Sequence, residues 1–518
     1  MESSENNAPQ RIVKIRRDYN TWVANETLED YALRFTPHSF RKWSIFRVSN
    51  TALGAISFLV LEVIGGALAV NFGFVNAFWA ILTISLIIFM TSLPISYYAA
   101  KYGLDMDLLT RGAGFGYIGS TISSFVYATF TFILFALEAV IMAYALSMYF
   151  DLPIYVWYLI SAVVVIPLVT HGVTLISRIQ MITQPIWLFL MVLPFIFIFA
   201  KEPDAIRGLM NFAGSSGYDS TFNIYMFGTA IAIGMALIPQ VGEQVDFLRF
   251  MPEKTQKNRF RWHLGVIFAG PGWIFIGMIK MFAGVLLAYL VLNGAKSVEE
   301  AVNPTYMYHV AFSYVFSNAD VLLAVTVFFV VLSQIKINIT NAYAGSLAWS
   351  NFFARLTHSH PGRVVWLLFN VLIATMLMLL DVFQALEQIL GLYSNIAISW
   401  ITAVVADLVI NKPLGLSPKG VEFRRAYLYD INPVGVGAMA IASLLSVLAF
   451  VGVFGLEAQS FSSFIAMFTA LICSPLFAWW TKGKYYLARQ PYKFHPAKTK
   501  ETCSICEREY EIDDIAYC

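Results

Sequence analysis

A polar stretch inside an apolar run carries the clearest chemistry in this sequence. The run 319–345 ends in QIKINITNAYAG and contains Gln334, Lys336, Asn338, Thr340 and Asn341. A charged side chain at the centre of a membrane helix costs roughly 2.5–3.5 kcal/mol on insertion scales, so it is expected to face protein or a water-filled cavity. Burial also disfavours the charged form of a lysine. The stretch therefore predicts a polar site within the membrane, organised around Lys336.

Two carboxylates also fall inside apolar runs. Glu62 lies in LEVIGGALA and Glu138 in FTFILFALEAVIMAYAL. Acidic residues within a membrane are functional candidates, and each of these two is a candidate partner for Lys336. The alternative is a permanent ion pair with a structural role, which is also our interpretation of Lys280 in GMIKMFAGV.

Composition places these groups in a membrane protein. Of 518 residues, 58% are hydrophobic and 13% are charged, whereas soluble domains hold about 25% charged residues. The net charge of +2 gives no indication of nucleic-acid binding, because the basic residues fall in loops between apolar runs. The sequence has no GxxxxGK phosphate-binding loop and no catalytic constellation, so we expect neither an enzyme nor a cofactor for transport.

The apolar runs predict an all-α polytopic protein with twelve transmembrane helices, embedded in the lipid bilayer. Runs of about 20 residues can cross a bilayer core of about 30 Å as helices. The predicted spans are 45–70, 76–100, 120–149, 153–172, 180–200, 222–243, 264–292, 319–345, 364–383, 386–410, 433–455 and 460–481.

The basic residues predict how the chain is oriented. Twelve spans place both termini on one side of the membrane. Of the 34 Lys and Arg residues, only Lys201, Arg207 and Lys296 lie in loops of the opposite side. Because positive residues concentrate in cytoplasmic loops, we expect cytoplasmic termini in the plasma (inner) membrane. The predicted domains are an N-terminal arm, 1–42, a transporter-like membrane domain, 43–482, and a cytoplasmic tail, 483–518.

Two of the spans carry residues that interrupt helices. The first contains Gly65-Gly66, and the sixth contains Gly234, Pro239 and Gly242 in one apolar run. Proline removes a helix hydrogen bond, and glycine adopts unwound conformations readily. Broken helices in the first and sixth positions predict two inverted repeats of five helices, with a substrate site at mid-membrane. The alternative for the glycines is close helix packing.

Four stretches together resemble the nucleobase–cation symporter family, the purine, cytosine and hydantoin permeases. LLTRGAGFGYIGS (108–120) resembles the start of that family's third helix, and EQVDFLRF (243–250) the end of its sixth. The tenth helix is similar to 386–412, and the start of the eleventh is similar to YDINPVGVGA (429–438). The resemblance covers roughly residues 40 to 490. It implies the leucine-transporter-like fold, with substrate between helices one, three, six and eight.

The resemblance also implies a sodium site on helix eight, which this chain has altered. The family's two hydroxyl ligands correspond to Lys336 and Ile337. A hard cation does not share its oxygen cage with an ammonium group, so we expect a sodium-independent protein, either proton-coupled through Lys336 or uncoupled. The alternatives are a structural Lys336, and a shifted register in which Ser333 and Thr340 still bind sodium.

The same comparison assigns the remaining site residues. Glu138 matches a position where the family's glutamine binds substrate. The other predicted substrate-binding residues are Gln240, Asn338, Asn341, Gly65 and Gly234, and the predicted cation or coupling residues are Lys336 and Glu62. The two aromatic residues that sandwich a flat substrate correspond to Leu134 and Leu237, so stacking on a planar ring is not expected.

The tail ends in CSICEREYEIDDIAYC, with Cys503, Cys506 and Cys518. In a reducing cytoplasm Cys-x-x-Cys more often binds zinc than forms a disulfide. A tetrahedral site needs four ligands, so we predict a zinc site completed by further chain. A cytoplasmic signalling domain, fused or associated, would fit that arrangement; the alternative is an ordinary tail.

The sequence thus predicts a secondary transporter for a small, polar, nitrogen-containing solute such as a nucleobase. The alternative is a membrane receptor in which the same site reports ligand to a cytoplasmic signalling domain.

Overall fold

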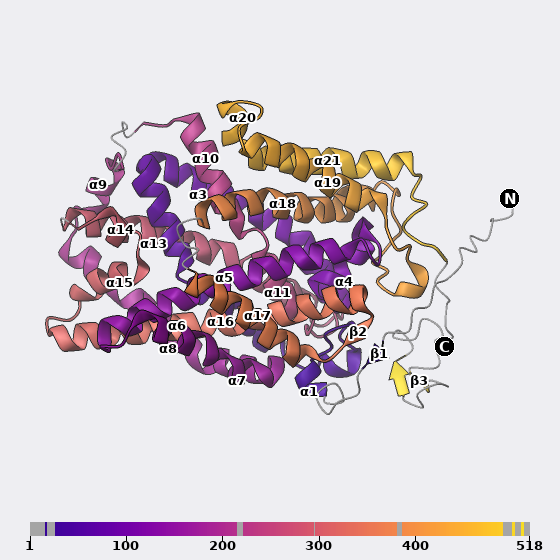
Figure 1. The fold of residues 1–518 in the computed structure, drawn as a ribbon, viewed down its shortest axis with the longest axis horizontal. Coiled ribbons are helices and arrows are strands. Elements are labelled where there is room, and N and C mark those ends of the chain that lie inside the picture. The colour runs from indigo at the N-terminus through magenta and orange to yellow at the C-terminus, as the bar shows by residue number, and fades with distance from the viewer. Residues whose placement is uncertain are drawn as a thin grey trace.

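Long helices running side by side along one axis dominate the computed structural model (Figure 1). It describes residues 16–17, 26–214, 221–294, 296–380, 386–489, 500–502 and 509–511. Within them, the only strands are short pairs: β1 (Arg16–Arg17) lies parallel to β2 (Ser359–His360), and β3 (Lys500–Thr502) antiparallel to β4 (Glu509–Glu511). The predicted all-α polytopic class is confirmed.

The helices follow one another in chain order. The first half holds α1 (Glu26–Glu29), η1 (His38–Phe40), α2 (Ile45–Leu53), η2 (Gly54–Ser57), α3 (Val60–Tyr102), α4 (Met106–Thr110), η3 (Arg111–Phe115), α5 (Ser120–Tyr149), α6 (Ile154–Val163), α7 (Val165–Thr170), α8 (Gly172–Lys201), α9 (Ala205–Met210), α10 (Ile224–Gly234), η4 (Met235–Leu237) and α11 (Gln240–Leu248). The second half holds α12 (Arg259–Ala269), α13 (Trp273–Asn293), α14 (Val298–Ala301), α15 (Pro304–Ser313), α16 (Ala319–Thr357), α17 (Arg363–Leu379), α18 (Leu386–Ala406), η6 (Asp407–Asn411), η7 (Arg425–Tyr427), α19 (Pro433–Phe450), α20 (Leu456–Ser460) and α21 (Ser462–Trp480).

Every predicted span overlaps helix in the structure, but their number is not settled at twelve. Within the described residues, nine helical segments are long and apolar enough to cross a membrane. Two shorter apolar segments, Ile154–Thr170 and Arg363–Leu379, correspond to the fourth and ninth predicted spans. The first and second spans share one long segment, since α3 continues through a corner at Gly73 (φ 76°, ψ 164°).

The first break does not lie at the predicted Gly65-Gly66. Helix α2 ends at Leu53, η2 follows, and Phe58 is extended (φ −60°, ψ 135°) before α3 begins at Val60. The predicted break is therefore wrong by about two turns, and Gly65-Gly66 lies within regular helix. We call residues 54–59 the first break.

Gly65 instead permits close packing, the alternative considered from the sequence. A Cβ on Gly65 would lie 1.9 Å from the backbone oxygen of Met281, and one on Gly284 would lie 2.1 Å from the oxygen of Glu62. Helices α3 and α13 thus approach each other with backbone against backbone. Small residues are what allows this in membrane proteins.

The second break lies where the sequence predicts it. Helix α10 ends at Gly234, a short 3-10 turn covers Met235–Leu237, and α11 begins at Gln240, directly after Pro239. Proline lacks the N–H that a continuous helix would use at this point. We call residues 235–239 the second break.

Helix pairing in the core joins the two halves of the chain. Helix α3 packs along α13, and α5 packs along α16, so the segment that carries the first and second spans packs on the seventh, and the third span packs on the eighth. Helices α1 and α4 and strand β2 lie at one end of the long axis, here called the terminal side, and α9, α14 and α15 lie at the opposite end, the far side (Figure 1).

Helix α16 is the longest element that reaches the centre from the second repeat. It spans 39 residues, so the predicted span 319–345 is extended by twelve residues on the terminal side. Its first turn is capped by Asn318, whose side chain accepts from the N–H of Asp320 (3.0 Å). It ends where His358 adopts a left-handed conformation (φ 55°).

We expect Gly65→Ala to lower the melting temperature of the purified protein in detergent. The added methyl would collide with the Met281 carbonyl, and overpacking of this kind costs about 1–3 kcal/mol. The matched control is Gly277→Ala on α13, because its Cβ would meet its nearest neighbours at 3.5 Å, an ordinary contact. Equal melting temperatures for the two variants would contradict this packing.

Candidate functional site

The first break is held by two charged side chains from different helices. The Glu138 carboxylate, on α5, accepts from the N–H groups of Leu59 and Val60 (both 3.3 Å). The Lys280 ammonium, on α13, donates to the carbonyl oxygens of Ile56 (3.0 Å) and Phe58 (2.6 Å). These backbone groups have no helical partner because the helix is interrupted. Glu138 thus binds the N–H groups at the start of α3, and Lys280 binds the carbonyl oxygens that precede it.

Glu62 completes this group of charges. Its Oε2 lies 3.4 Å from Lys280 Nζ, and its Oε1 accepts from the Tyr308 hydroxyl (2.7 Å). All three side chains, like that of Glu138, are fully buried. The predicted pairing of Glu62 with Lys336 is therefore wrong, and Lys280 has a buried ion-pair partner of the kind expected for it. We call Glu62, Glu138, Lys280 and Tyr308 the first-break clamp.

Lys336, on α16, contacts α8 instead of the first-break clamp. Its Nζ donates to the side-chain oxygens of Gln180, Thr183 (3.2 Å) and Gln184 (2.9 Å). No carboxylate of the described residues lies within ion-pair distance of this ammonium group, so the predicted pairing with Glu138 is wrong as well. A buried cation held only by neutral acceptors keeps much of its desolvation penalty.

Gln180 connects Lys336 to the first break. Its Nε2 also donates to the Lys336 carbonyl oxygen (2.9 Å). A Cβ placed on Gly54 would lie only 2.2 Å from the Gln180 side chain, so the amide is packed directly on the first residue of the break. The Gln180 side chain thus lies between Lys336 and the first break.

A second polar group joins α11 to α16 beside the second break. Glu243 Oε2 accepts from Gln240 Nε2 (2.9 Å) and from the Thr340 hydroxyl (3.1 Å). Asn341 Nδ2 donates to Asn338 Oδ1 (3.2 Å). All these side chains are fully buried. The predicted substrate residues Gln240, Asn338 and Asn341 thus lie on two helices that are bonded to each other through Glu243 and Thr340.

Several polar atoms of this group have no hydrogen-bond partner. The unpaired atoms are Gln240 Oε1, Glu243 Oε1, Asn338 Nδ2, Asn341 Oδ1, and both Oε1 and Nε2 of Gln334. On α16, residues 334, 338 and 341 share one face of the helix, because their spacing is one and two turns. An unpaired buried polar atom costs about 1–3 kcal/mol. We call Gln240, Glu243, Gln334, Asn338 and Asn341 the central amide cluster.

The other predicted site residues occupy supporting positions. Gly234 packs on α3, since its Cβ would lie 2.3 Å from Ile84 Cδ1. Leu134 and Leu237, at the positions of the family's aromatic sandwich, are buried in one apolar cluster. Gly65 contacts α13 instead of the site. The flat-ring sandwich is therefore absent from these two positions.

Sequence reasoning missed residues that connect the first break to α16. Ser57 donates to the Ser333 carbonyl oxygen (2.9 Å), and Trp187 Nε1 donates to the Ser333 hydroxyl (3.0 Å). Lys280 was assigned to a structural pair, but not to the first break. A run such as GMIKMFAGV does not indicate which helix its lysine faces. The one available signal for these contacts is Ser57, a polar residue between two apolar stretches.

Further buried charged groups join the helices toward the terminal side. Arg355 contacts Asp107 (2.5 Å) and donates to Ser124 (2.6 Å). Arg249 donates to the Asp30 carbonyl oxygen (2.7 Å), which ties the segment after α1 to α11. These groups are buried. The members of the central amide cluster are themselves fully buried in the observed conformation.

A metal site is not part of this arrangement. Within the described parts of the chain, no three His, Cys, Asp or Glu side chains gather in a way that could hold a metal ion. The predicted zinc ligands Cys503, Cys506 and Cys518 lie outside the described residues.

Comparison with known proteins finds the fold but no sequence relative. Neither a protein-family model nor a curated protein matches this chain. Mhp1, described as a nucleobase-cation-symport-1 family transporter in a closed conformation with bromovinylhydantoin bound, aligns with TM-score 0.64 at 16% identity, over 89% of this chain and 96% of its own. Its inward facing conformation aligns with TM-score 0.64 at 16% identity, over 86% and 92% of the two chains.

A third solved structure has the same architecture. A Na+-coupled sialic acid symporter, in a substrate-bound outward-open state, aligns with TM-score 0.60 at 10% identity, over 87% of this chain and 94% of its own. At such identities the likeness shows the fold, and this fold is shared with membrane transporters. The architecture that the family resemblance implied is thus confirmed.

We expect Lys280→Met to destabilise the protein strongly. The change leaves Glu62 charged and buried and leaves the Ile56 and Phe58 carbonyls without their donor. Removing one partner of a buried pair costs about 3–5 kcal/mol. Thermal unfolding in detergent measures the loss, and the double variant Glu62→Gln/Lys280→Met should recover part of it.

A surface ion pair supplies the control for this experiment. Lys296 lies 3.5 Å from Glu300, with 54% of its side chain exposed, and exposed pairs contribute little. Lys296→Met should therefore leave the melting temperature unchanged. If Lys280→Met unfolded at the same temperature as Lys296→Met, the first-break clamp would not be holding the helix.

Proposed function

We propose that this protein is a secondary transporter that moves a small, polar, nitrogen-containing solute, such as a nucleobase or related compound, by alternating access. The observation that supports this most is the central amide cluster, whose unpaired polar atoms are buried beside the second break. A ligand that pairs these atoms removes their cost. In broken-helix transporters the substrate site lies at such interruptions.

The unpaired atoms indicate the chemistry of the solute. Four of the six are oxygens (on Gln240, Glu243, Gln334 and Asn341), and two are the amide nitrogens of Gln334 and Asn338. Oxygens accept hydrogen bonds and amide nitrogens donate them, so the best match is a solute with several N–H donors and one or two acceptors. Leu134 and Leu237 offer no aromatic faces, so recognition would depend on hydrogen bonds more than on stacking.

Glu138 limits the choice of solute further. Helix N-termini attract anions, and the N-terminus of α3 at the first break already binds the Glu138 carboxylate. A solute carboxylate would have to displace this buried side chain. We therefore favour neutral or cationic solutes, with Glu138 acting from beside Gln334, its neighbour on α16.

Two lysines favour a transporter that does not use sodium. Lys280 donates to the carbonyl oxygens of the first break. Lys336 donates to Gln180, which packs on Gly54. The alternative ligands, Ser333 and Thr340, already bond to Trp187 and Glu243. Lys336 is the candidate proton carrier, because its contacts are neutral.

Alternating access would open the cluster to one side at a time. The positive-inside pattern favours a cytoplasmic terminal side, and the Arg355–Asp107 and Arg249–Asp30 contacts would then form the inner seal. Substrate would shift the balance of outward- and inward-open states only by its differential affinity for them.

A receptor is the second candidate. The filled first break supports it, since a site that already holds its own cation and anion needs no coupled ion. A cytoplasmic signalling domain, fused or associated through the cysteine-containing tail, would then respond to ligand. Transport and sensing differ in whether the ligand crosses the membrane.

We expect a thermal-shift screen of nucleobases, hydantoins, amines and amino acids to identify an N–H-rich ligand, and labelled ligand to accumulate in proteoliposomes. Asn341→Ala and Gln240→Ala should abolish the ligand-induced shift, because each removes atoms of the cluster. Asn211→Ala, on the exposed far side, is the control and should keep the full shift.

The outcomes separate the candidates. Accumulation of label supports transport. Saturable binding without uptake overturns the transporter and leaves the receptor. Binding that survives both cluster variants would place the ligand elsewhere and contradict the proposed site.

We expect uptake and binding by the wild type to be the same in sodium and choline buffers. Lys336→Ala should abolish any acceleration by an inward proton gradient while ligand binding persists, because the variant loses the proton carrier but keeps the cluster. Uptake with and without each gradient is the measurement. Sodium-stimulated uptake by the wild type would show that the lysines do not replace the ion.

A further inference from the structure

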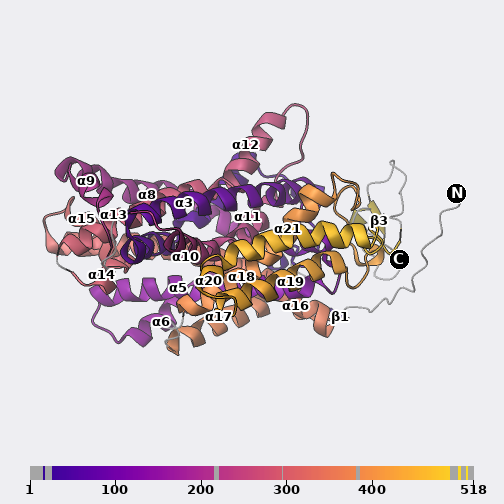
Figure 2. The ribbon, with the colours of Figure 1, turned by 90° about the horizontal axis from the view of Figure 1, so that it is seen from above.

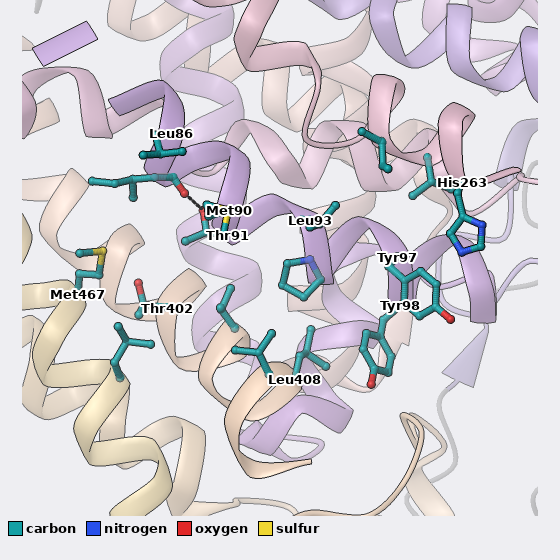
Figure 3. Close-up of a pocket in the computed structure, with 17 residues that line it drawn as sticks. Leu86, Met90, Thr91, Leu93, Tyr97, Tyr98, His263, Thr402, Leu408 and Met467 are labelled. Atoms are coloured by element: carbon teal, nitrogen blue, oxygen red, sulfur yellow. Dashed lines mark hydrogen bonds between the residues drawn. The ribbon is translucent and has the colours of Figure 1, made fainter. Parts of the chain in front are cut away.

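A groove on the outside of the bundle has a long apolar part and one polar end (Figure 3). It lies between α3, α12, α18 with η6, and α21, and its volume is about 790 Å³. Leu86 and Met90, both 58% exposed, and Val409, 45% exposed, lie on its outer rim. In a membrane-spanning bundle, this rim faces the acyl chains of the bilayer.

The tyrosine and histidine side chains of the groove gather at one end. Tyr97, Tyr98 and His263 lie together there, and Leu86 and Met90 lie toward the other end (Figure 3). Thr91 and Thr402 lie in the apolar part of the groove, where the Thr91 hydroxyl donates to the Ile87 carbonyl oxygen of its own helix. From residue 86 to residue 98, an α-helix rises about 18 Å at 1.5 Å per residue. This is close to half of a bilayer core of about 30 Å. The groove thus runs from mid-membrane to the terminal side, where α3 ends at Tyr102.

Basic side chains surround the polar end. Lys254 Nζ donates to the Tyr97 hydroxyl (3.1 Å), and Lys101 Nζ lies 5.9 Å from the centre of the same ring. The His263 ring stacks on it at 6.2 Å and 17°. The neighbouring acid, Glu253, bonds to His38 (2.6 Å). Asp407, at the start of η6, is paired with Lys412 (3.3 Å). Among the described residues, Lys254 and Lys101 have no carboxylate within ion-pair distance, so this end of the groove carries positive charge.

We propose that this groove binds one anionic phospholipid, with an acyl chain along α3 and the phosphate between Lys254, Lys101 and His263. Charge complementarity selects this occupant: basic pockets between membrane helices bind anionic head groups. A zwitterionic lipid would fill the apolar part equally well, but its head group carries no net charge to match the basic end.

The position of the groove gives the lipid a role in the working of the protein. One wall is formed by α3 and α12, and the other by α18, η6 and α21. Helix α12 and the loop before it stand out from the bundle (Figure 2), so Lys254, in this loop, and His263, on α12, reach the membrane surface. A lipid held across both walls stabilises their present spacing, and its loss would favour conformations in which they separate.

The test compares phosphatidylglycerol with phosphatidylcholine as the probe lipids. Purified protein is placed in discs of pure phosphatidylcholine or of phosphatidylcholine doped with phosphatidylglycerol. Native mass spectrometry then counts retained lipid, and thermal unfolding measures stabilisation. We expect one retained phosphatidylglycerol and a higher melting temperature in the doped discs.

Variants assign the effect to the groove. Lys254→Gln should weaken phosphatidylglycerol retention about tenfold, the loss expected for one charge-assisted contact. Lys257→Gln, an exposed residue of the same loop, is the charge-matched control and should retain the lipid. Met90→Trp fills the apolar part from the exposed rim and should reduce retention of both lipids.

Each other result overturns the proposal. Equal retention of the two lipids would show that charge does not select the occupant. Equal losses from Lys254→Gln and Lys257→Gln would show general attraction to a charged surface, with no site. Unchanged retention by both Lys254→Gln and Met90→Trp would place the bound lipid elsewhere on the protein.

Discussion

A helix interrupted inside a membrane exposes backbone N–H and C=O groups that lipid cannot satisfy, so protein groups must do so. At the first break this requirement brings Glu138 from α5 and Lys280 from α13 onto the same few residues. Two opposite charges then lie in the core, and Glu62 and Tyr308 follow to complete their contacts. Close backbone packing of α3 on α13, through Gly65 and Gly284, holds the lysine within reach.

The two breaks of this fold are therefore not equivalent. At the first, the side chains present satisfy the interrupted backbone, so an external ion has little left to bind. At the second, Gln240 and Glu243 bond to each other and to Thr340 but keep unpaired oxygens. The unpaired amide and carboxylate atoms beside the second break consequently belong to α11 and α16, whereas Glu138 and Lys280 at the first break are bonded to its backbone.

The sequence predicts the parts of this arrangement that depend on periodicity and on proline. Apolar length located the helices, and Pro239 located the second break, because proline acts locally. The first break was misplaced since Gly54 looks ordinary in sequence, and the Gly65-Gly66 pair serves packing. The partner of Glu62 was misassigned for a related reason. Residue spacing fixes the position along a helix, whereas the helix faced depends on packing between distant segments.

The two buried lysines differ in the groups that surround them. Lys280 lies among carbonyl oxygens and the Glu62 carboxylate, so its charge is compensated where it is formed. Lys336 has three neutral oxygens from α8 and, among the described residues, no carboxylate in ion-pair distance. Movement of α8 against α16 would change the oxygens around Lys336, and it would also shift Trp187, whose ring centre lies 5.4 Å from Lys280 Nζ. Since Gln180 also packs on Gly54, that movement would reach the first break, so Lys336 and the first break are linked through one side chain of α8.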